Sequence, residues 1–261
     1  MEGIPIVYPK NNDEGASDTS TGSTPPDVEL ITTLEGGFLA DEKEPPDRDR
    51  DPTPKIAQCM KQYLSLPSSS YSTLMPYQAS QVYNILKICF PGEVNVIVDA
   101  TAHIGGDSIL FANTFKNSKI VAVDCDQEAI MCLEHNITTF SDTSRFEVIK
   151  ANSVRWIEAE KRVADFYYFD PPWGGPRYYS KKEVELYLDG LPICEVINTV
   201  FALGLTKKIL LKVPRNFAYP ALKLAVNGTC KLYYIKKPQK NGSIAYGLVL
   251  ISDDRRKSWP D

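Results

Sequence analysis

Few of the side chains that hold metal ions or cross-link a chain are present in this sequence of 261 residues. It contains only two histidines, His103 and His135, and six cysteines without a Cys-x-x-Cys pair. Disulfide frameworks and zinc sites both need ligands at short, regular spacings. We therefore expect no metal, and we expect the cysteines to be small buried hydrophobic residues.

Long apolar segments are also absent from the sequence. No run approaches the roughly 18 uninterrupted apolar residues that a membrane helix needs. The stretch from Met1 to Pro5 shows neither the basic nor the apolar region of a signal peptide. These patterns predict a soluble, intracellular protein without a membrane partner, and we expect it to be a monomer.

Charge is divided unevenly along the chain. Residues 1–55 contain 13 acidic and 5 basic side chains, whereas the remaining residues contain 20 acidic and 24 basic ones. Residues 1–54 are also rich in Pro, Ser, Thr and Gly, a composition that predicts a disordered leader. Its short apolar patch, residues 30–34, is a candidate docking motif for a protein partner. The mildly basic remainder is compatible with an anionic partner such as RNA.

From residue 94 onward, short apolar runs alternate with amphipathic segments, which predicts strands that alternate with helices. The alternation indicates an α/β fold with a doubly wound, mostly parallel, seven-stranded sheet of Rossmann-like form. The expected strands are 94–98, 119–123, 145–150, 165–169 and 208–213, closed by a hairpin of 231–236 and 244–251. The expected helices are 55–64, 77–90, 107–115, 127–140 and 186–203.

These elements divide the chain into a disordered leader, a small helical N-terminal extension, one α/β domain and a tail. Pro76 fits the first turn of the second helix of the extension, where its missing N–H is harmless. Open α/β sheets bind ligands at the carboxyl ends of their strands, so the loops that follow the strands are the candidate sites. The expected boundaries are 1–54, 55–92, 93–253 and 254–261.

Two of these loops have the features of a nucleoside-binding site. Glycines in the loop 99–106, after the first strand, let the backbone approach a ligand. About 20 residues later, Asp124 ends the second strand, where an acidic residue meets ribose hydroxyls. Asn152 and Ser153 follow the third strand and are candidate contacts to an adenine edge. The candidate cofactor-binding residues are Asp99, Thr101, Gly105, Gly106, Asp124, Asn152, Ser153 and Asp170.

The identity of the cofactor follows from what these loops lack. No G-x-G-x-x-G cradle for a pyrophosphate is present, which disfavours a nicotinamide cofactor. S-adenosyl-L-methionine carries no phosphate and needs no such cradle. It is therefore the expected cofactor.

A stiff loop follows the fourth strand, with the sequence Asp170-Pro171-Pro172-Trp173-Gly174-Gly175-Pro176. Consecutive prolines restrict the backbone and remove two N–H donors. Asp170 can accept hydrogen bonds from an exocyclic amine, and Trp173 offers a flat face to a planar base. We take Asp170 and Trp173 as candidate catalytic residues. The candidate substrate-binding residues are Pro171, Pro172, Trp173, Arg215 and Asn216.

The Asp-Pro-Pro-Trp string is similar to a motif of methyltransferases that act on amino groups of nucleobases. Its extension through Pro176, followed by Tyr178, resembles the trimethylguanosine synthase family, the RNA cap guanosine-N2 methyltransferases. Val213-Pro214-Arg215-Asn216 is similar to the Leu-Pro-Arg-Asn of that family after the fifth strand. Residues 72–86 and 243–247 show looser similarities, so the resemblance spans roughly residues 56–251.

This resemblance implies a class I methyltransferase fold and a 7-methylguanosine cap of RNA, or its nucleotide, as the partner. The exocyclic N2 of the cap base would receive the methyl group. In the family the matching tryptophan stacks on the cap base, which implies that role for Trp173. Methylation at N7 makes the base cationic, and a cation–π contact contributes about 0.5–2 kcal/mol. Arg215 is a candidate contact to the cap phosphates.

The chain departs from the family pattern at three positions. His103 stands where the family has glycine, Asn152 where an acidic residue is common, and Asp170 where serine is frequent. Two alternatives therefore stay open. One is adenine-N6 methylation of RNA or DNA, which Asp-Pro-Pro-Trp also serves, and the other is a catalytically silent cap- or RNA-binding subunit.

Overall fold

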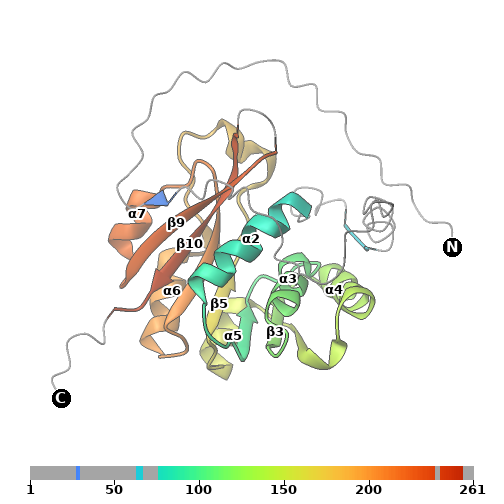
Figure 1. Ribbon diagram of the computed structural model, residues 1–261. Helices are drawn as coiled ribbons and strands as arrows, with labels where there is room; N and C mark the ends of the chain where they lie inside the picture. Colours follow the sequence, from blue (N-terminus) through green and yellow to red (C-terminus); the bar gives the residue numbers. More distant parts are fainter. Residues whose placement is uncertain (1–27, 30–62, 67–75, 239–241, 255–261) are drawn as a thin grey trace.

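The computed structural model describes residues 28–29, 63–66, 76–238 and 242–254. Its centre is one sheet with the strand order β1-β9-β10-β8-β5-β2-β3-β4 (Figure 1). The strands are β1 (Val28–Glu29), β2 (Val96–Asp99), β3 (Lys119–Asp124), β4 (Phe146–Lys150), β5 (Phe166–Phe169), β8 (Lys208–Pro214), β9 (Thr229–Lys236) and β10 (Ile244–Ser252).

Most of this sheet is parallel. Strands β4, β3, β2, β5 and β8 pair in parallel, while β10 runs antiparallel between β8 and β9. The closing hairpin of β9 and β10 is therefore present as expected. The two-residue strand β1 lies beside β9 and adds to the seven expected strands. The predicted α/β fold with a mostly parallel, Rossmann-like sheet is confirmed.

Helices cover both faces of the sheet, as doubly wound topology requires. On one face lie α2 (Pro76–Cys89), α3 (Gly106–Thr114) and α4 (Gln127–Phe140). On the other lie α5 (Ser153–Glu160), α6 (Ile193–Ala202) and α7 (Tyr219–Ala225). Two 3-10 turns, η2 (Thr143–Arg145) and η3 (Gly175–Ser180), and a hairpin of β6 (Tyr187–Leu188) and β7 (Leu191–Pro192) complete the described elements.

Successive residues of the central strand β5 enter different cores. Phe166 and Tyr168 pack with α2 and α3, whereas Tyr167 and Phe169 pack with the helices of the opposite face. All four side chains are at most 2% exposed. A strand buried on both faces reads as a continuous apolar run, which is why the sequence shows no alternation there.

The helix expected over residues 186–203 is wrong in its first half. Residues 187–192 form the β6–β7 hairpin, which turns at Asp189 (φ 52°) and Gly190 (φ 85°). Left-handed backbone at two successive positions interrupts a helix. An Asp-Gly pair is a strong hairpin signal, but the surrounding apolar pattern hides it, and α6 begins only at Ile193.

The N-terminal extension is described in part. Its second expected helix is present as α2, and Pro76 occupies the first helical position. The helix expected over 55–64 lies largely outside the described residues, and Tyr63 and Leu64 are not helical. The leader also lies outside them except for the residues of β1. In the part of the chain that is described, no helix is long and apolar enough to cross a membrane.

Candidate functional site

The loops that the sequence singles out meet at one edge of the sheet. Strands β8, β5, β2 and β3 are neighbours in the sheet order and run in the same direction. Their carboxyl ends therefore lie side by side. The loop after β5, residues 170–176, is called the substrate loop here, and it lies next to the loop after β2, residues 99–106, which is called the cofactor loop. A hydrogen bond joins the two loops, from the backbone N–H of Asp170 to the Thr101 Oγ1, at 2.6 Å.

Asp99 ends β2 and is completely buried at the base of the cofactor loop. The Ser108 hydroxyl donates to its Oδ2 at 2.5 Å, and the backbone N–H of Thr101 donates to its Oδ1 at 3.2 Å. Burial raises the pKa of Asp99 to about 7, although the hydrogen bond from Ser108 opposes the rise. The carboxyl group thus holds the loop to the first turn of α3.

Asp124 ends β3 and is only half-buried. Its Oδ2 accepts from the backbone N–H of His103 at 2.8 Å, and its Oδ1 accepts from that of Asp126 at 2.9 Å. His103, the departure from the family glycine, adopts a left-handed backbone (φ 45°). In this conformation the backbone N–H of His103 donates to the Asp124 carboxylate and fixes the position of that carboxylate.

The two glycines of the cofactor loop have different surroundings. Gly105 has φ +90°, and a Cβ there would lie 2.4 Å from the Leu133 Cδ1 on α4. Glycine is thus required by the packing of α4 as well as by the turn. Gly106 begins α3.

Asn152 and Ser153, the candidate adenine contacts, both have structural partners. The Asn152 side chain caps α5 by accepting from the backbone N–H of Arg155 at 3.0 Å. The buried Ser153 hydroxyl donates to the Ala100 carbonyl at 2.5 Å and so links α5 to the cofactor loop. Contact of either residue with adenine stays a prediction.

The substrate loop is anchored by its aromatic residue. Trp173 packs against both main cores, and its ring meets Tyr178 edge-on at 5.4 Å and Tyr246 at 6.4 Å. Pro171 is buried and Pro172 is exposed. The Trp173 Nε1 and the Tyr246 hydroxyl are both buried, and neither has a hydrogen-bond partner among the described residues. Buried donors without partners are costly, so this end of the site is suited to a polar ligand.

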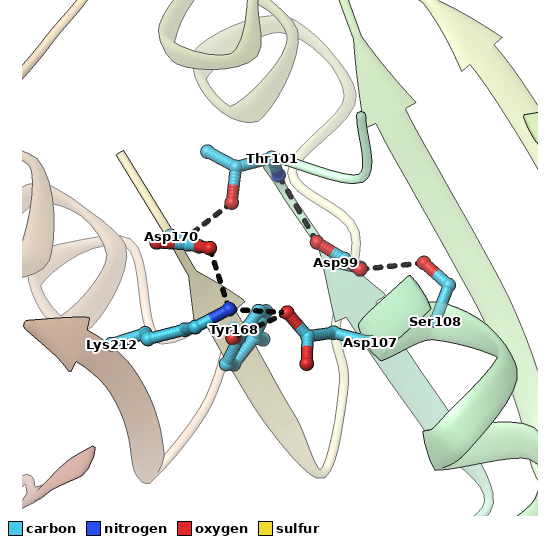
Figure 2. A network of polar contacts seen from close by, with 7 residues as sticks. All are labelled: Asp99, Thr101, Asp107, Ser108, Tyr168, Asp170 and Lys212. Atoms are coloured by element: carbon cyan, nitrogen blue, oxygen red, sulfur yellow. Dashed lines mark hydrogen bonds and ion pairs between the residues drawn. The ribbon is translucent and has the colours of Figure 1, made fainter. Parts of the chain in front are cut away.

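A buried lysine joins the substrate loop to the first turn of α3 (Figure 2). The Lys212 Nζ, on β8, lies 2.9 Å from the Asp170 Oδ2 and 3.1 Å from the Asp107 Oδ2 on α3. The Tyr168 hydroxyl donates to the same Asp107 oxygen at 2.9 Å. Burial lowers the pKa of Lys212, but the carboxylates Asp107 and Asp170 outweigh burial and hold that pKa well above its usual range.

Lys212 is a functional candidate that the sequence reasoning missed. The available signal is a single charged residue inside an otherwise apolar strand, Ile209-Leu210-Leu211-Lys212-Val213. Lysine is almost never fully buried unless it is paired. A lysine within a buried apolar strand therefore predicts acidic neighbours. In the structure the side chain of Lys212 is 6% exposed.

Arg215 and Asn216, after β8, lie on the substrate side. The Arg215 guanidinium is exposed and lies over the Tyr179 ring at 5.7 Å, and Tyr179 stacks on Tyr178 at 4.0 Å. The Asn216 Nδ2 donates to the carbonyls of Tyr178 (2.9 Å) and Lys181 (2.8 Å). Asn216 therefore holds η3 in place, while Arg215 is open to a ligand.

A second missed residue ties the N-terminal segment to the cofactor loop. Asn136 on α4 is completely buried. Its Nδ2 donates to the carbonyls of Ile104 (2.8 Å) and Leu64 (2.9 Å), and its Oδ1 accepts from the Leu64 N–H (2.8 Å). The Tyr63 hydroxyl donates to the same Ile104 carbonyl at 3.1 Å. The segment 63–66 is thus fastened over the cofactor loop.

The donors and acceptors of the cofactor side suit S-adenosyl-L-methionine. A carboxylate offers about four lone-pair positions, and two of them at Asp124 are taken by backbone amides. The remaining positions are available to two ribose hydroxyls. Within the described ranges, no group of three or more His, Cys, Asp or Glu side chains is placed to hold a metal ion.

The chain resembles several curated proteins, and two of these similarities are partial matches. The chain is 30% identical over 125 residues to an uncharacterized protein, L320, of Acanthamoeba polyphaga mimivirus, with 48% of each protein covered. It is 25% identical over 165 residues to the trimethylguanosine synthase of Saccharomyces cerevisiae, with 59% of this chain and 51% of that protein covered. The chain thus matches about half the length of these curated relatives.

Solved structures share the fold at low identity. An S-adenosylmethionine-dependent methyltransferase from Agrobacterium tumefaciens has a TM-score of 0.50 and 13% identity, covering 69% of this chain and 62% of that one. The precorrin-6y C5,15-methyltransferase from Geobacter metallireducens GS-15 also has a TM-score of 0.50 and 13% identity, covering 74% and 95%.

The family model that matches is described as RNA cap guanine-N2 methyltransferase. It covers residues 94–253, which is more than half of the chain and includes every strand from β2 to β10. The match includes the cofactor loop, the substrate loop and the strand that carries Lys212. The chain therefore belongs to the RNA cap guanine-N2 methyltransferase family, and this membership implies S-adenosyl-L-methionine as its cofactor.

Proposed function

We propose that this protein methylates the exocyclic N2 of a 7-methylguanosine RNA cap. The observation that carries the proposal is the contact between the Asp-Pro-Pro-Trp loop and the cofactor loop, where the Asp170 N–H binds the Thr101 hydroxyl at 2.6 Å. In our proposal this contact brings the carboxylate of Asp170 and the indole of Trp173 beside the methyl donor. The family match and the partial similarity to yeast trimethylguanosine synthase support the same base and the same atom.

The reaction is a direct methyl transfer between two bound molecules. S-adenosyl-L-methionine supplies the methyl group from its sulfonium, and the C–S electron pair stays with sulfur as the N2 lone pair forms the new C–N bond. Such a transfer is accelerated chiefly by proximity and orientation. In our proposal Asp170 accepts a hydrogen bond from the amine and stabilises the positive charge that develops on it. The amine proton then leaves to water.

Recognition of the cap follows from the aromatic residues of the substrate side. The indole of Trp173 stacks on the cationic base and contributes a cation–π attraction of about 0.5–2 kcal/mol that neutral guanine lacks. The exposed Arg215 guanidinium binds the cap phosphates, and guanidinium groups suit phosphate geometry.

A substrate comparison tests this proposal. Purified protein is incubated with labelled S-adenosyl-L-methionine and, separately, 7-methyl-GTP, GTP and an adenine-containing oligonucleotide. We expect transfer to 7-methyl-GTP at the N2 position, located by mass spectrometry of the product nucleoside. Transfer to GTP as efficient as to 7-methyl-GTP would refute the cap selectivity. Transfer to the oligonucleotide alone would indicate adenine-N6 methylation, and cofactor binding without transfer would indicate a silent binding subunit.

A further inference from the structure

The buried charge of Lys212 is not explained by folding alone. Its side chain is 6% exposed and lies in the middle of a strand whose flanking residues Leu211 and Val213 are at most 1% exposed. Replacing a buried ion pair by apolar residues of similar size is often neutral or stabilising. An unbranched apolar side chain would therefore serve the packing of β8 as well, and the ammonium points to another role.

The Lys212 ammonium contacts the acid of the substrate loop and is held there by other parts of the fold. Lys212 touches one oxygen of Asp170, Oδ2, and leaves Oδ1 without a hydrogen-bond partner in the described part of the chain. Asp107 holds the ammonium from the side of α3, and the Tyr168 hydroxyl holds Asp107 through the same oxygen. The ammonium also lies over the ring of Tyr246, 5.1 Å from its centroid. Lys212 is thus held in one place by three elements, next to the acid of the substrate loop.

We propose that Lys212 is a positioning residue for methyl transfer, which keeps Asp170 ionised and leaves the Asp170 Oδ1 for the acceptor amine. Asp107 supports this role by fixing the ammonium between α3 and the substrate loop. The inference rests on the proposed function for the identity of the amine, but the ionisation of Asp170 is a property of the protein by itself.

The electrostatic surroundings of Asp170 set the direction of the effect. The pKa of Asp170 lies above its ordinary value, because burial and the Asp107 carboxylate raise it by more than the Lys212 ammonium lowers it. Loss of Lys212 would leave the carboxylates of Asp107 and Asp170 facing each other in a buried site. Because a neighbouring positive charge lowers a carboxyl pKa by about 1–3 units, its removal should raise the pKa of Asp170 by a similar amount. The charged or titratable groups around Asp170 are Lys212 on β8, Asp107 on α3, His103 in the cofactor loop, Asp99 on β2, Tyr168 on β5 and Tyr246 on β10.

The test compares two lysines of the same strand. Lys212→Met removes the ammonium from the site. Lys208→Met is the matched control, because Lys208 lies at the opposite end of β8, where its Nζ binds the Cys89 carbonyl at 2.7 Å. The pKa of Asp170 is measured by carboxyl-carbon NMR titration of protein labelled at aspartate, with Asp170→Asn to assign the signal. The pH dependence of kcat is measured with 7-methyl-GTP.

We expect Lys212→Met to raise the pKa of Asp170 by about 1–3 units. The acidic limb of the pH profile of kcat should move to higher pH by the same amount. Lys208→Met should change neither. Adding Asp107→Asn to Lys212→Met removes the like charge and should move both values back toward those of the parent. A purely structural role would lower kcat at every pH without displacing the limb.

Two further outcomes distinguish a failure of the Lys212 inference from misfolding of the variant and from a failure of the proposed function. If Lys212→Met does not fold, Lys212→Gln, which keeps a polar side chain but no charge, replaces it and should also raise the pKa of Asp170 and move the limb to higher pH. An unchanged titration of Asp170 in folded Lys212→Met, or in Lys212→Gln where that variant replaces it, would overturn the role of Lys212. If the parent protein does not methylate 7-methyl-GTP, the proposed function fails, while the NMR titration still decides whether Lys212 controls Asp170.

Discussion

The two halves of the site differ in how completely their polar groups are satisfied. On the cofactor side, Asp99, Asp124 and Ser153 each bind groups of the protein itself. On the substrate side, the Trp173 Nε1 and the Tyr246 hydroxyl are buried and have no partner among the described residues. The cofactor side is therefore held by its own hydrogen bonds, whereas the substrate side contains buried polar groups that no described residue satisfies.

This difference suggests that the two ligands use different parts of the chain. The cofactor loop is held by backbone amides and by α3 and α4, so changes there are expected to act on cofactor affinity and stability. The substrate loop carries its chemistry in the side chains of Asp170 and Trp173, so changes there are expected to act on transfer and on cap affinity. The following experiments test that separation.

The largest effect is expected for Asp170→Asn. Replacing the carboxylate by an amide removes the negative charge that stabilises the developing positive charge, and loss of one such electrostatic contact typically reduces kcat by about 10²–10³-fold. Cofactor affinity should change by no more than a few-fold, as measured by titration calorimetry with S-adenosylhomocysteine. Glu160→Gln, at the exposed end of α5, serves as the control. A variant that retains full kcat would contradict the role of Asp170.

A smaller effect, on the opposite side, is expected for Asp124→Ala. Hydrogen bonds to a charged group contribute about 1.5–3 kcal/mol, and each 1.4 kcal/mol is a tenfold change in affinity. The Kd for S-adenosylhomocysteine should therefore rise by about 10–150-fold, while the Kd for 7-methyl-GTP stays the same. An equal rise in the Kd values of both ligands would contradict the view that the two ligands use different parts of the chain.

For Trp173 we expect a selective loss of cap affinity. Trp173→Ala removes a cation–π contact of about 0.5–2 kcal/mol, which corresponds to a rise of about 2–30-fold in the Kd for 7-methyl-GTP. Trp173→Phe retains a flat aromatic face and should fall between the parent and the alanine variant. Binding is measured for 7-methyl-GTP and GTP in parallel. If the ratio of the two affinities is the same in all three proteins, Trp173 does not read the charge of the base.

The last prediction concerns the stability of the cofactor side and not catalysis or ligand affinity. The folded-state pKa of Asp99 is about 7, above its ordinary value of 3.8, so the folded protein binds this proton more tightly than the unfolded chain. The free energy of unfolding should therefore decrease as pH rises from about 4 to 7, by up to about 1.4 kcal/mol per pH unit. Asp99→Asn should remove this slope. Urea unfolding of both proteins at pH 5, 6, 7 and 8 measures the difference, and equal slopes would exclude a role for Asp99.

Much of the fold is predictable from local sequence patterns. The strands around Val98, Val121 and Tyr167 are apolar runs of the expected length, and they occur in the sheet as expected. Elements that depend on a single turn or cap are less predictable. The hairpin at Asp189 and Gly190 lies within an apolar pattern that predicts a helix, and the short helix α5 begins at the capping residue Asn152, whose side chain is also a candidate ligand contact.

The sequence by itself determined the order of the sheet strands and of most helices, and the types of side chain that the loops after the strands carry, but not the β6–β7 hairpin or the helices α5 and α7. It also marks the Asp-Pro-Pro-Trp loop as a candidate substrate site, because donor-poor, stiff loops of this kind are unusual at a strand end. The roles of the individual loop residues stay predictions. Periodicity and motif spacing are local properties of the chain, so both are readable without coordinates.

Only the tertiary structure decided which distant residues share the site. The ammonium of Lys212 meets Asp107, which lies 105 residues earlier in the chain, at 3.1 Å. Asn136 likewise fastens Leu64, 72 residues away, over the cofactor loop. Such contacts depend on which strands are neighbours and on the direction in which each side chain points. Neither is encoded in any single segment, and the low exposure that makes the pairing necessary arises only when the layers have packed.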